Sequence, residues 1–324
     1  MDRILSGDRP TGPLHLGHYF GTLQNRVRLQ RAGAQLTLVV ADYQVLTDTD
    51  TAARLGPAVD ALVLDYLAAG VDPETTTIFA HSAVPALNQL LLPFLSLVSV
   101  AELERNPTVK DEIAHARRAS VSGLMFTYPA HQAADILFGK ATVVPVGQDQ
   151  LPHLELTRTI ARRFADRYGP VFPVPAALLS AAPLLLGTDG TKMSKSRGNA
   201  IPLGADADET ARLIRSAKTD AGRHITYDPV ARPEVSSLVL LAALCLDRDP
   251  HAVAADVGPG GAAGLKKLVT DAVNEYFAPL RARRAAYARD PGALRALLRD
   301  GNARATAVAE ATLAEVKTAM NMHY

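Results

Sequence analysis

Residues 4–27 read Ile4-Leu-Ser-Gly-Asp-Arg-Pro-Thr-Gly-Pro-Leu-His-Leu-Gly-His-Tyr-Phe-Gly-Thr-Leu-Gln-Asn-Arg-Val27, and this stretch decides the fold. Residues 4–7 form a short strand pattern, and a loop rich in glycine and proline follows at residues 8–13. Apolar side chains then recur at helical spacing, at Leu16, Tyr19, Phe20, Leu23 and Val27. A strand, a Gly/Pro loop and a helix in this order are typical of a parallel α/β sheet, whose ligands lie at the carboxyl ends of its strands.

Strand and helix patterns continue to alternate through the first half of the chain. Nearly continuous apolar runs predict further parallel strands at residues 36–41, 77–80 and 141–147. Helical patterns alternate with them at residues 51–70, 85–104 and 150–168. We therefore predict an α/β fold with a doubly wound, Rossmann-like parallel sheet.

The strand pattern fades after about residue 206, and apolar residues then recur only at helical spacing. We expect two domains: the Rossmann-like domain over residues 1–190 and a C-terminal α-helical domain over residues 198–324. A loop at residues 191–197 marks the boundary. The last helix, at about residues 303–320, is expected to pack back on the first domain.

Composition sets broad limits on the class of protein. The chain of 324 residues has a net charge of +1, so any contact with nucleic acid must come from local basic patches. One candidate patch, for which a solvated helix face is the equal alternative, comprises Arg281, Arg283, Arg284 and Arg289. Cys245 is the only cysteine, which excludes an intramolecular disulfide and favours a reducing cytoplasm. The chain has no signal-peptide pattern and no apolar run long enough for a bilayer, so we expect no membrane association.

Two short motifs together predict a phosphate-binding site. His15-Leu16-Gly17-His18 stands at the start of a helix, where free N–H groups attract an anion and glycine lets the backbone approach it closely. Lys192-Met193-Ser194-Lys195-Ser196 places two cations on a serine-flanked loop. Each motif alone has a plain alternative, as core or cap histidines and as a solvated loop. Their order and the strand–loop–helix context favour a shared site.

This pair of motifs resembles the two signature motifs of class I aminoacyl-tRNA synthetases, and the surrounding residues are similar to the tryptophanyl branch over nearly the whole chain. The resemblance implies that ATP is a substrate and that Mg²⁺ is held mainly by its phosphates, with no protein metal site. It implies that His15 and His18 donate to the phosphates. It also implies that Lys110, Lys192 and Lys195 neutralise the leaving pyrophosphate. The ATP-binding set implied is Gly7, Arg9, Thr11, His15, Gly17, His18, Gly147, Asp149, Lys192, Met193, Ser194 and Lys195.

A third motif, Gly147-Gln148-Asp149-Gln150, follows a predicted strand and precedes a predicted helix. Asp149 can cap that helix or accept from ribose hydroxyls. The motif resembles the Gly-Glu-Asp-Gln segment of tryptophanyl enzymes, with Gln148 in place of the usual glutamate. The resemblance implies that Asp149 binds ribose and that Gln150 binds the ammonium group of the amino acid. Tyrosyl relatives typically carry a Ser-Asp-Gln version, so this segment favours tryptophan.

A fourth motif predicts the side-chain pocket. Tyr128, Gln132 and Asp135 are spaced at i, i+4 and i+7, so one helix face presents all three. The resemblance implies that Asp135 accepts the indole N–H. Many bacterial relatives carry methionine in place of Gln132, and the same spacing occurs in tyrosyl enzymes, so the substrate is less certain than the reaction. The tryptophan-binding set implied is Leu5, Gly7, Gln44, Tyr128, Gln132, Asp135, Val144, Val146 and Gln150.

The resemblance thus implies an enzyme that activates L-tryptophan with ATP and transfers it to the 3′ end of tRNA(Trp). It implies a homodimer with no DNA partner, and residues 83–103 are apolar enough to form its interface or to lie inside the monomer. Three alternatives stay open: tyrosyl-type specificity, a related nucleotidyltransferase, and a paralogue that binds tryptophan or its adenylate in signalling or protein partnership. Whether the chain is a housekeeping or an auxiliary copy is also open.

Overall fold

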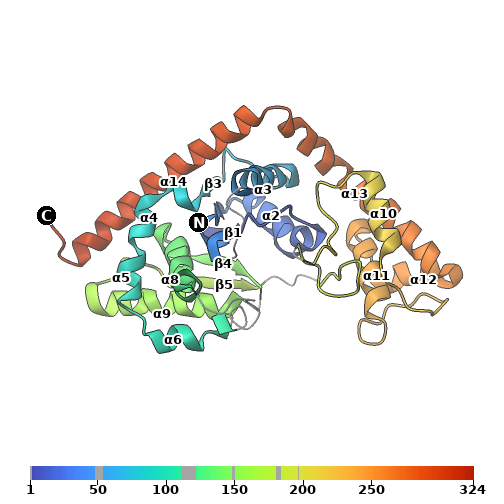
Figure 1. The fold of residues 1–324 in the computed structure, drawn as a ribbon, viewed down its shortest axis with the longest axis horizontal. Helices are drawn as coiled ribbons and strands as arrows, with labels where there is room; N and C mark the ends of the chain where they lie inside the picture. Colours follow the sequence, from blue (N-terminus) through green and yellow to red (C-terminus); the bar gives the residue numbers. More distant parts are fainter. Residues whose placement is uncertain are drawn as a thin grey trace.

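Five parallel strands form the centre of the first half of the molecule (Figure 1). The computed structural model describes residues 2–47, 54–107, 109–110, 122–147, 150–179, 184–195 and 197–324. The strands are β1 (Arg3–Asp8), β2 (Gln35–Val40), β3 (Thr77–Ala80), β4 (Val143–Val146) and β5 (Ala176–Leu179), in the order β3-β2-β1-β4-β5. The chain order reverses between β1 and β4, so the carboxyl ends of these two strands flank the crevice in which such sheets bind ligands.

The predicted fold class is confirmed, and so are four of the strands. Strand β5 was not predicted, because its four residues Ala-Ala-Leu-Leu are too short to show a distinct period. The predicted helix at residues 51–70 is observed as α3 (Leu55–Ala69), and the one at residues 150–168 as α9 (Leu151–Tyr168).

The predicted continuous helix at residues 85–104 is wrong. The structure has three short helices there, α4 (Pro85–Gln89), α5 (Leu91–Leu95) and α6 (Val100–Arg105). Pro93 has no N–H for the carbonyl of Gln89, so α4 ends at that residue. The Ser99 side chain accepts from the Glu102 N–H, while Glu102 accepts from the Ser99 N–H, and this capping box starts α6 as a new helix.

The helical segment after the first loop has three parts: α1 (Leu16–His18), a π-helical turn η1 (Tyr19–Leu23) and α2 (Gln24–Arg31). A 3-10 turn η2 (Tyr43–Thr47) follows β2, and another, η4 (His81–Ala83), follows β3. The long helix α8 (Gly123–Phe138) then leads into β4. The turns η2 and η4 follow the carboxyl ends of β2 and β3, at the edge of the sheet where parallel sheets bind their ligands.

The second half is helical, with α10 (Ala207–Ser216), α11 (Pro233–Leu246), α12 (Pro250–Val257), a 3-10 turn η6 (Gly258–Gly260), α13 (Gly261–Ala288) and α14 (Pro291–Ala319). Helix α14 runs back from the helical half along the outer edge of the sheet (Figure 1). Its Gly301 lies so close to β3 that a Cβ there would be 1.7 Å from the carbonyl oxygen of Ile78. Asn302 accepts from the Ala80 N–H at 2.8 Å, so α14 completes the edge strand β3.

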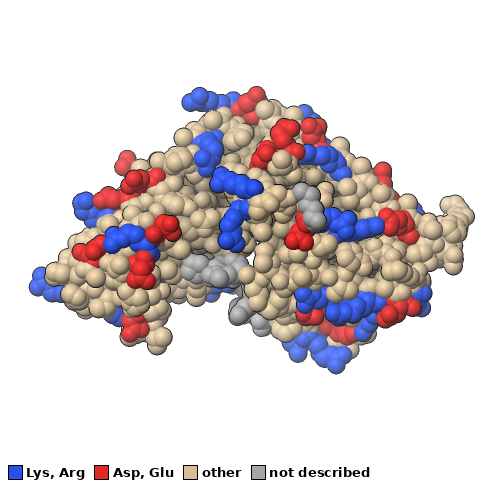
Figure 2. Space-filling model, turned by 180° about the vertical axis from the view of Figure 1, so that it is seen from behind, with Lys and Arg blue, Asp and Glu red and all other residues tan. Residues whose placement is uncertain are grey.

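Three of the four arginines in the candidate basic patch hold α13 against its neighbours. Arg281 donates to the Ala205 carbonyl at 2.9 Å, Arg283 to the Ala68 carbonyl at 2.8 Å, and Arg284 to Asp65 at 2.8 Å. For Arg281 and Arg284, which are half-buried, these hydrogen bonds argue against a freely solvated helix face, whereas Arg283 is exposed. Figure 2 shows Lys and Arg interspersed with Asp and Glu on the face it presents. No helix among the described residues is both long and apolar enough to span a bilayer.

Candidate active site

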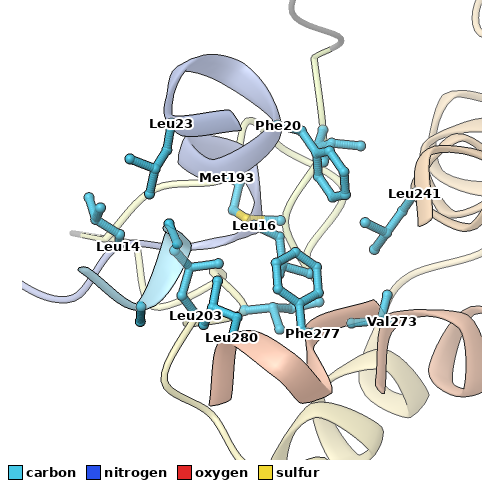
Figure 3. Close-up of a cluster of buried hydrophobic side chains, with 14 of the residues drawn as sticks. Leu14, Leu16, Phe20, Leu23, Met193, Leu203, Leu241, Val273, Phe277 and Leu280 are labelled. Carbon is cyan, nitrogen blue, oxygen red and sulfur yellow. The ribbon is translucent and has the colours of Figure 1, made fainter. Parts of the chain in front are cut away.

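The two phosphate-site motifs, far apart in sequence, lie together at the carboxyl end of β1. Met193 is buried in one apolar cluster with Leu14 and Leu16, and residues from α11 and α13 complete it (Figure 3). Lys195 Nζ donates to the carbonyl of Gly12 at 2.9 Å. The loop that carries Lys192 and Lys195, hereafter the lysine loop, is therefore anchored by the apolar packing of Met193. Lys195 extends from it over the glycine-proline loop at residues 9–14, hereafter the phosphate loop.

The two histidines at the start of α1 are both neutral at pH 7. Their rings lie 3.7 Å apart between centroids. Burial first, and then the charges of His18 and Lys195, lower the pKa of His15 to about 3. Burial lowers the pKa of His18 to about 4, with Lys195 adding to the effect and Asp8 opposing it. The backbone N–H of His15 donates to His18 Nδ1 at 3.3 Å, so the neutral ring of His18 carries its proton on Nε2, where it can donate to an oxyanion.

Two of the implied glycines have a steric reason in the structure. A Cβ at Gly17 would lie 3.1 Å from the His15 ring, so glycine lets the two histidine rings approach each other. A Cβ at Gly7 would lie 2.3 Å from the Val39 carbonyl oxygen, so Gly7 allows β1 to pack on β2.

An acid at the end of β1, with 16% of its side chain exposed, precedes the phosphate loop and was missed in the sequence. Asp8 Oδ2 lies 2.5 Å from Arg26 Nη1 and accepts from the Tyr66 hydroxyl at 2.7 Å. Although burial opposes it, the Arg26 guanidinium holds the pKa of Asp8 below its usual value. The Asp8 carboxyl group therefore stays ionised and is paired with Arg26.

A second acid, which is buried, joins the phosphate loop to the helical half. Asp65 on α3 accepts from the Leu14 N–H at 3.0 Å and from Arg284 on α13 at 2.8 Å. The lysine loop has a similar hidden support, because Asn199 accepts from the Ser194 N–H at 2.8 Å and donates to the Lys192 carbonyl at 3.2 Å. No local pattern marks these residues, since their partners lie on other elements or across a tight loop.

The implied side-chain pocket gathers around α8. Leu5, Val144 and Val146 are buried in one apolar cluster that also includes residues of α8. Asp135 is buried on α8, and burial first, then Asp42, raises the pKa of its carboxyl well above the ordinary value. Gln132 is half-buried on the same helix.

Tyr128 is buried about two helical turns before Asp135, and its hydroxyl has a hydrogen-bond partner. Its hydroxyl lies 3.0 Å from His153 Nε2, and His153 Nδ1 lies 3.4 Å from the Asn106 amide nitrogen. His153 on α9 was not singled out in the sequence. Two further histidines that sequence reasoning missed, His81 and His131, lie beside Asp135. The position of His81 directly after a predicted strand is the one signal that points to it.

The remaining implied residues are located by the elements of the fold on which, or beside which, they lie. Gln44 lies half-buried on η2, after β2, and Gln150 is the residue before α9. Gln148 and Asp149 lie outside the described residues, and so does Ser196. Lys110 is exposed after α6, and no contact among the described residues brings it to the phosphate loop. Arg9 and Thr11 are exposed on the phosphate loop itself.

The chain is similar to known proteins in both sequence and fold. The family described as tRNA synthetases class I (W and Y) matches residues 2–278. The tryptophan–tRNA ligase of Treponema pallidum (strain Nichols) is 41% identical over 330 residues, covering 99% of this chain and 97% of that protein. The tryptophan–tRNA ligase of Clostridium longisporum is 39% identical with the same coverage of both chains. The tryptophanyl-tRNA synthetase of Campylobacter jejuni, solved with ADP and tryptophan, matches with a TM-score of 0.85 at 28% identity, covering 98% of this chain and 99% of that one.

Proposed function

The chain belongs to the class I tRNA synthetases of the tryptophan and tyrosine branch, and on that premise we propose that it is a tryptophan–tRNA ligase. It activates L-tryptophan with ATP to tryptophanyl-adenylate and pyrophosphate, and then transfers tryptophan to the 3′ end of tRNA(Trp). One arrangement carries the proposal: Lys195 contacts the loop that leads to the His15/His18 pair, while α8, which packs in the apolar cluster of Leu5 and Val144, carries the buried Asp135.

In the first step the tryptophan carboxylate attacks the α-phosphorus of ATP, and the bond to pyrophosphate breaks. The neutral rings of His15 and His18 donate N–H groups to phosphate oxygens, and Lys192 and Lys195 stabilise the negative charge that grows on the leaving group. Lys195 reaches the phosphates by leaving the Gly12 carbonyl. In the second step a ribose hydroxyl of the tRNA terminus attacks the adenylate carbonyl and AMP leaves. Neither step needs a protein nucleophile.

Mg²⁺ belongs on the phosphate oxygens of ATP in this proposal. Among the described residues no three His, Cys, Asp or Glu side chains converge on a point that suits a metal ion. Asp8, the last residue of β1, is held by Arg26 and Tyr66. When bound, the ion neutralises phosphate charge.

The remaining roles complete the amino-acid and nucleotide sites. Asp149 accepts from the ribose hydroxyls, Gln150 binds the ammonium group of tryptophan, and Lys110 adds charge at the pyrophosphate. Asp135 accepts the indole N–H between walls made by Leu5 and Val144. Indole offers one donor and no acceptor, which suits an apolar pocket with a single buried carboxyl group.

Assembly and location also belong to the proposal. The segment 83–103 is partly interior, with Leu90 and Phe94 buried, but Leu92 is 76% and Val100 64% exposed. These two side chains support a homodimer interface on the outer face of α5 and α6. The helical half, residues 198–324, binds the anticodon region of the tRNA, and the enzyme works in the cytoplasm.

Amino-acid-dependent ATP–pyrophosphate exchange, measured with each standard amino acid in turn, tests the function. We expect exchange with tryptophan far above that with tyrosine, and charging of tRNA(Trp) in a second assay. Tyrosine-dependent exchange above tryptophan-dependent exchange would refute the substrate, and exchange without tRNA charging would favour the signalling paralogue.

A further inference from the structure

Two histidines and one carboxylate form a buried polar cluster next to the proposed indole acceptor. His81 directly follows β3 and is 0% exposed, while His131 and Asp135, one turn apart on α8, are 4% and 2% exposed. The His81 and His131 rings stack with centroids 3.9 Å apart and an angle of 22° between their planes. The three side chains therefore lie together in the interior of the protein and are almost inaccessible to solvent.

The closest contact in this cluster joins His81 to Asp135. His81 Nε2 lies 3.2 Å from Asp135 Oδ1, although the two groups are not aligned for a hydrogen bond. Among the described residues, neither ring nitrogen of His81 makes a hydrogen bond of good geometry, although the Asn88 side chain lies close enough to raise its pKa, and Asp135 Oδ1 has no hydrogen-bond partner. Buried polar atoms without partners are costly, so their presence in one place needs a reason. A ligand whose binding aligns the pair supplies that reason.

The groups around the pair hold it in place. His131 Nε2 lies 2.6 Å from the Asn88 amide oxygen, so this nitrogen carries the proton of the neutral ring. Asp42, the nearby acid, accepts from the N–H and hydroxyl of Ser82 and from the Tyr43 N–H. His131 thus fixes the plane of the His81 ring by stacking, and the negative charge of Asp42 is held at the turn that begins with His81.

The pKa shifts of Asp135 and His81 favour a single proton shared between the two side chains. Burial first, then Asp42, raises the pKa of Asp135. Burial first, then His131, lowers the pKa of His81, and the Asn88 side chain opposes this shift. Burial lowers the pKa of His131 to about 4, with Asp42 opposing it. The shifts of Asp135 and His81 both disfavour the charged form of the group concerned, so the environment favours the state of the pair that has no net charge. With one proton between Asp135 Oδ1 and His81 Nε2, Asp135 Oδ2 carries none and can only accept, whether the shared proton lies nearer the oxygen or the nitrogen.

We propose that His81 is a specificity-determining positioning residue, which holds a proton against Asp135 Oδ1 and so keeps Asp135 Oδ2 as the acceptor for the indole N–H. Without His81, the proton of a buried Asp135 can bind to either carboxyl oxygen. When it is on Oδ2, that oxygen presents an O–H donor to the indole N–H of the substrate, and two donors cannot form a hydrogen bond. The inference rests on the proposed function, since it requires tryptophan in this pocket.

The test compares tryptophan with β-(3-benzothienyl)alanine, in which sulfur replaces the indole N–H and the ring size is kept. The readout is the ratio of kcat/KM for the two amino acids in ATP–pyrophosphate exchange. We expect the wild type to prefer tryptophan by about 30-fold or more, because the analogue leaves the acceptor unpaired. His81→Leu should lower this ratio by about tenfold, mainly through a loss with tryptophan. His81→Gln, whose amide can donate to Asp135, should restore most of it.

Matched variants separate this role from a merely structural one. His131→Phe keeps the stacked ring and leaves the His81–Asp135 contact in place, so it should preserve the ratio. If His81→Leu fails to fold, His81→Phe, which keeps the stack and removes the donor, is judged by the same criterion. The chain contains no tryptophan, so the change in the emission of the amino acid on binding can be followed in each variant without a contribution from protein indole groups.

The outcomes are distinct. Normal tryptophan-dependent exchange in the wild type, together with a ratio in His81→Leu or His81→Phe within about twofold of the wild-type ratio, would overturn this inference alone. No tryptophan-dependent exchange in the wild type would overturn the proposed function, and this inference with it.

Discussion

Replacing Lys195 by alanine tests the assignment of the lysine loop most directly. In the structure Lys195 Nζ donates to the Gly12 carbonyl at 2.9 Å and is half-buried. Burial lowers its pKa, with Asp8 and Asp65 opposing that shift. To reach departing pyrophosphate, the amine must give up the Gly12 hydrogen bond, which costs about 1 kcal/mol net.

The expected magnitude follows from these two contributions. A preorganised donor aimed at developing charge contributes about 3 kcal/mol to the transition state. With the Gly12 bond subtracted, Lys195→Ala should cost about 2 to 3 kcal/mol, or roughly 30- to 150-fold in the rate of adenylate formation. Tryptophan binding should change little, because the amine acts mainly in the transition state.

Single-turnover adenylate formation measures the rate, and the fluorescence of tryptophan measures its binding. Arg197→Ala is the control, because it removes a charge from the same loop while its guanidinium contacts Thr191 and not the phosphate loop. The reasoning fails if Lys195→Ala forms adenylate within about threefold of the wild-type rate, or if Arg197→Ala is equally slow.

Three further predictions concern stability and assembly. Gly301→Ala should lower the free energy of unfolding by several kcal/mol, because its Cβ would lie 1.7 Å from the Ile78 carbonyl oxygen, whereas Gly56→Ala, with open space around it, should be neutral or stabilising by about 1 kcal/mol in the same denaturant titrations. Equal effects of the two would contradict the packing of α14 on β3. His15 has a folded pKa of about 3, below its unfolded value, so the unfolded chain binds more protons and stability should fall as the pH drops from about 6.5 toward 3. His15→Asn should flatten this slope, and an unchanged slope would count against a neutral His15. Leu92→Glu should shift light scattering from dimer to monomer mass, since that side chain is 76% exposed, and a monomeric wild type would refute the interface.

Local patterns predicted most of the sheet because strand and helix periods are read over a few residues. Strands β1 to β4 follow from apolar runs bounded by glycine and proline, whereas the short β5 carries too little pattern to be recognised. The helix predicted over residues 85–104 failed because a single apolar period outweighed the effect of Pro93 on the carbonyl of Gln89.

The candidate site was predicted in its motifs but not in its supports. His15, His18 and Lys195 stand in recognisable order, and the structure brings them together. Asp8 finds Arg26 and Tyr66 only after β1, α2 and α3 have packed, and nothing in the sequence couples these three residues.

The sequence by itself determined the strand–loop–helix opening, the two phosphate motifs and the helical second half, because each depends on neighbours along the chain. Only the tertiary structure decided that Arg284 donates to Asp65, that Asn302 of α14 accepts from β3, and that His81 contacts Asp135. The physical reason is distance along the chain. These contacts join residues separated by tens to hundreds of positions, and burial of the elements that carry them selects the partners.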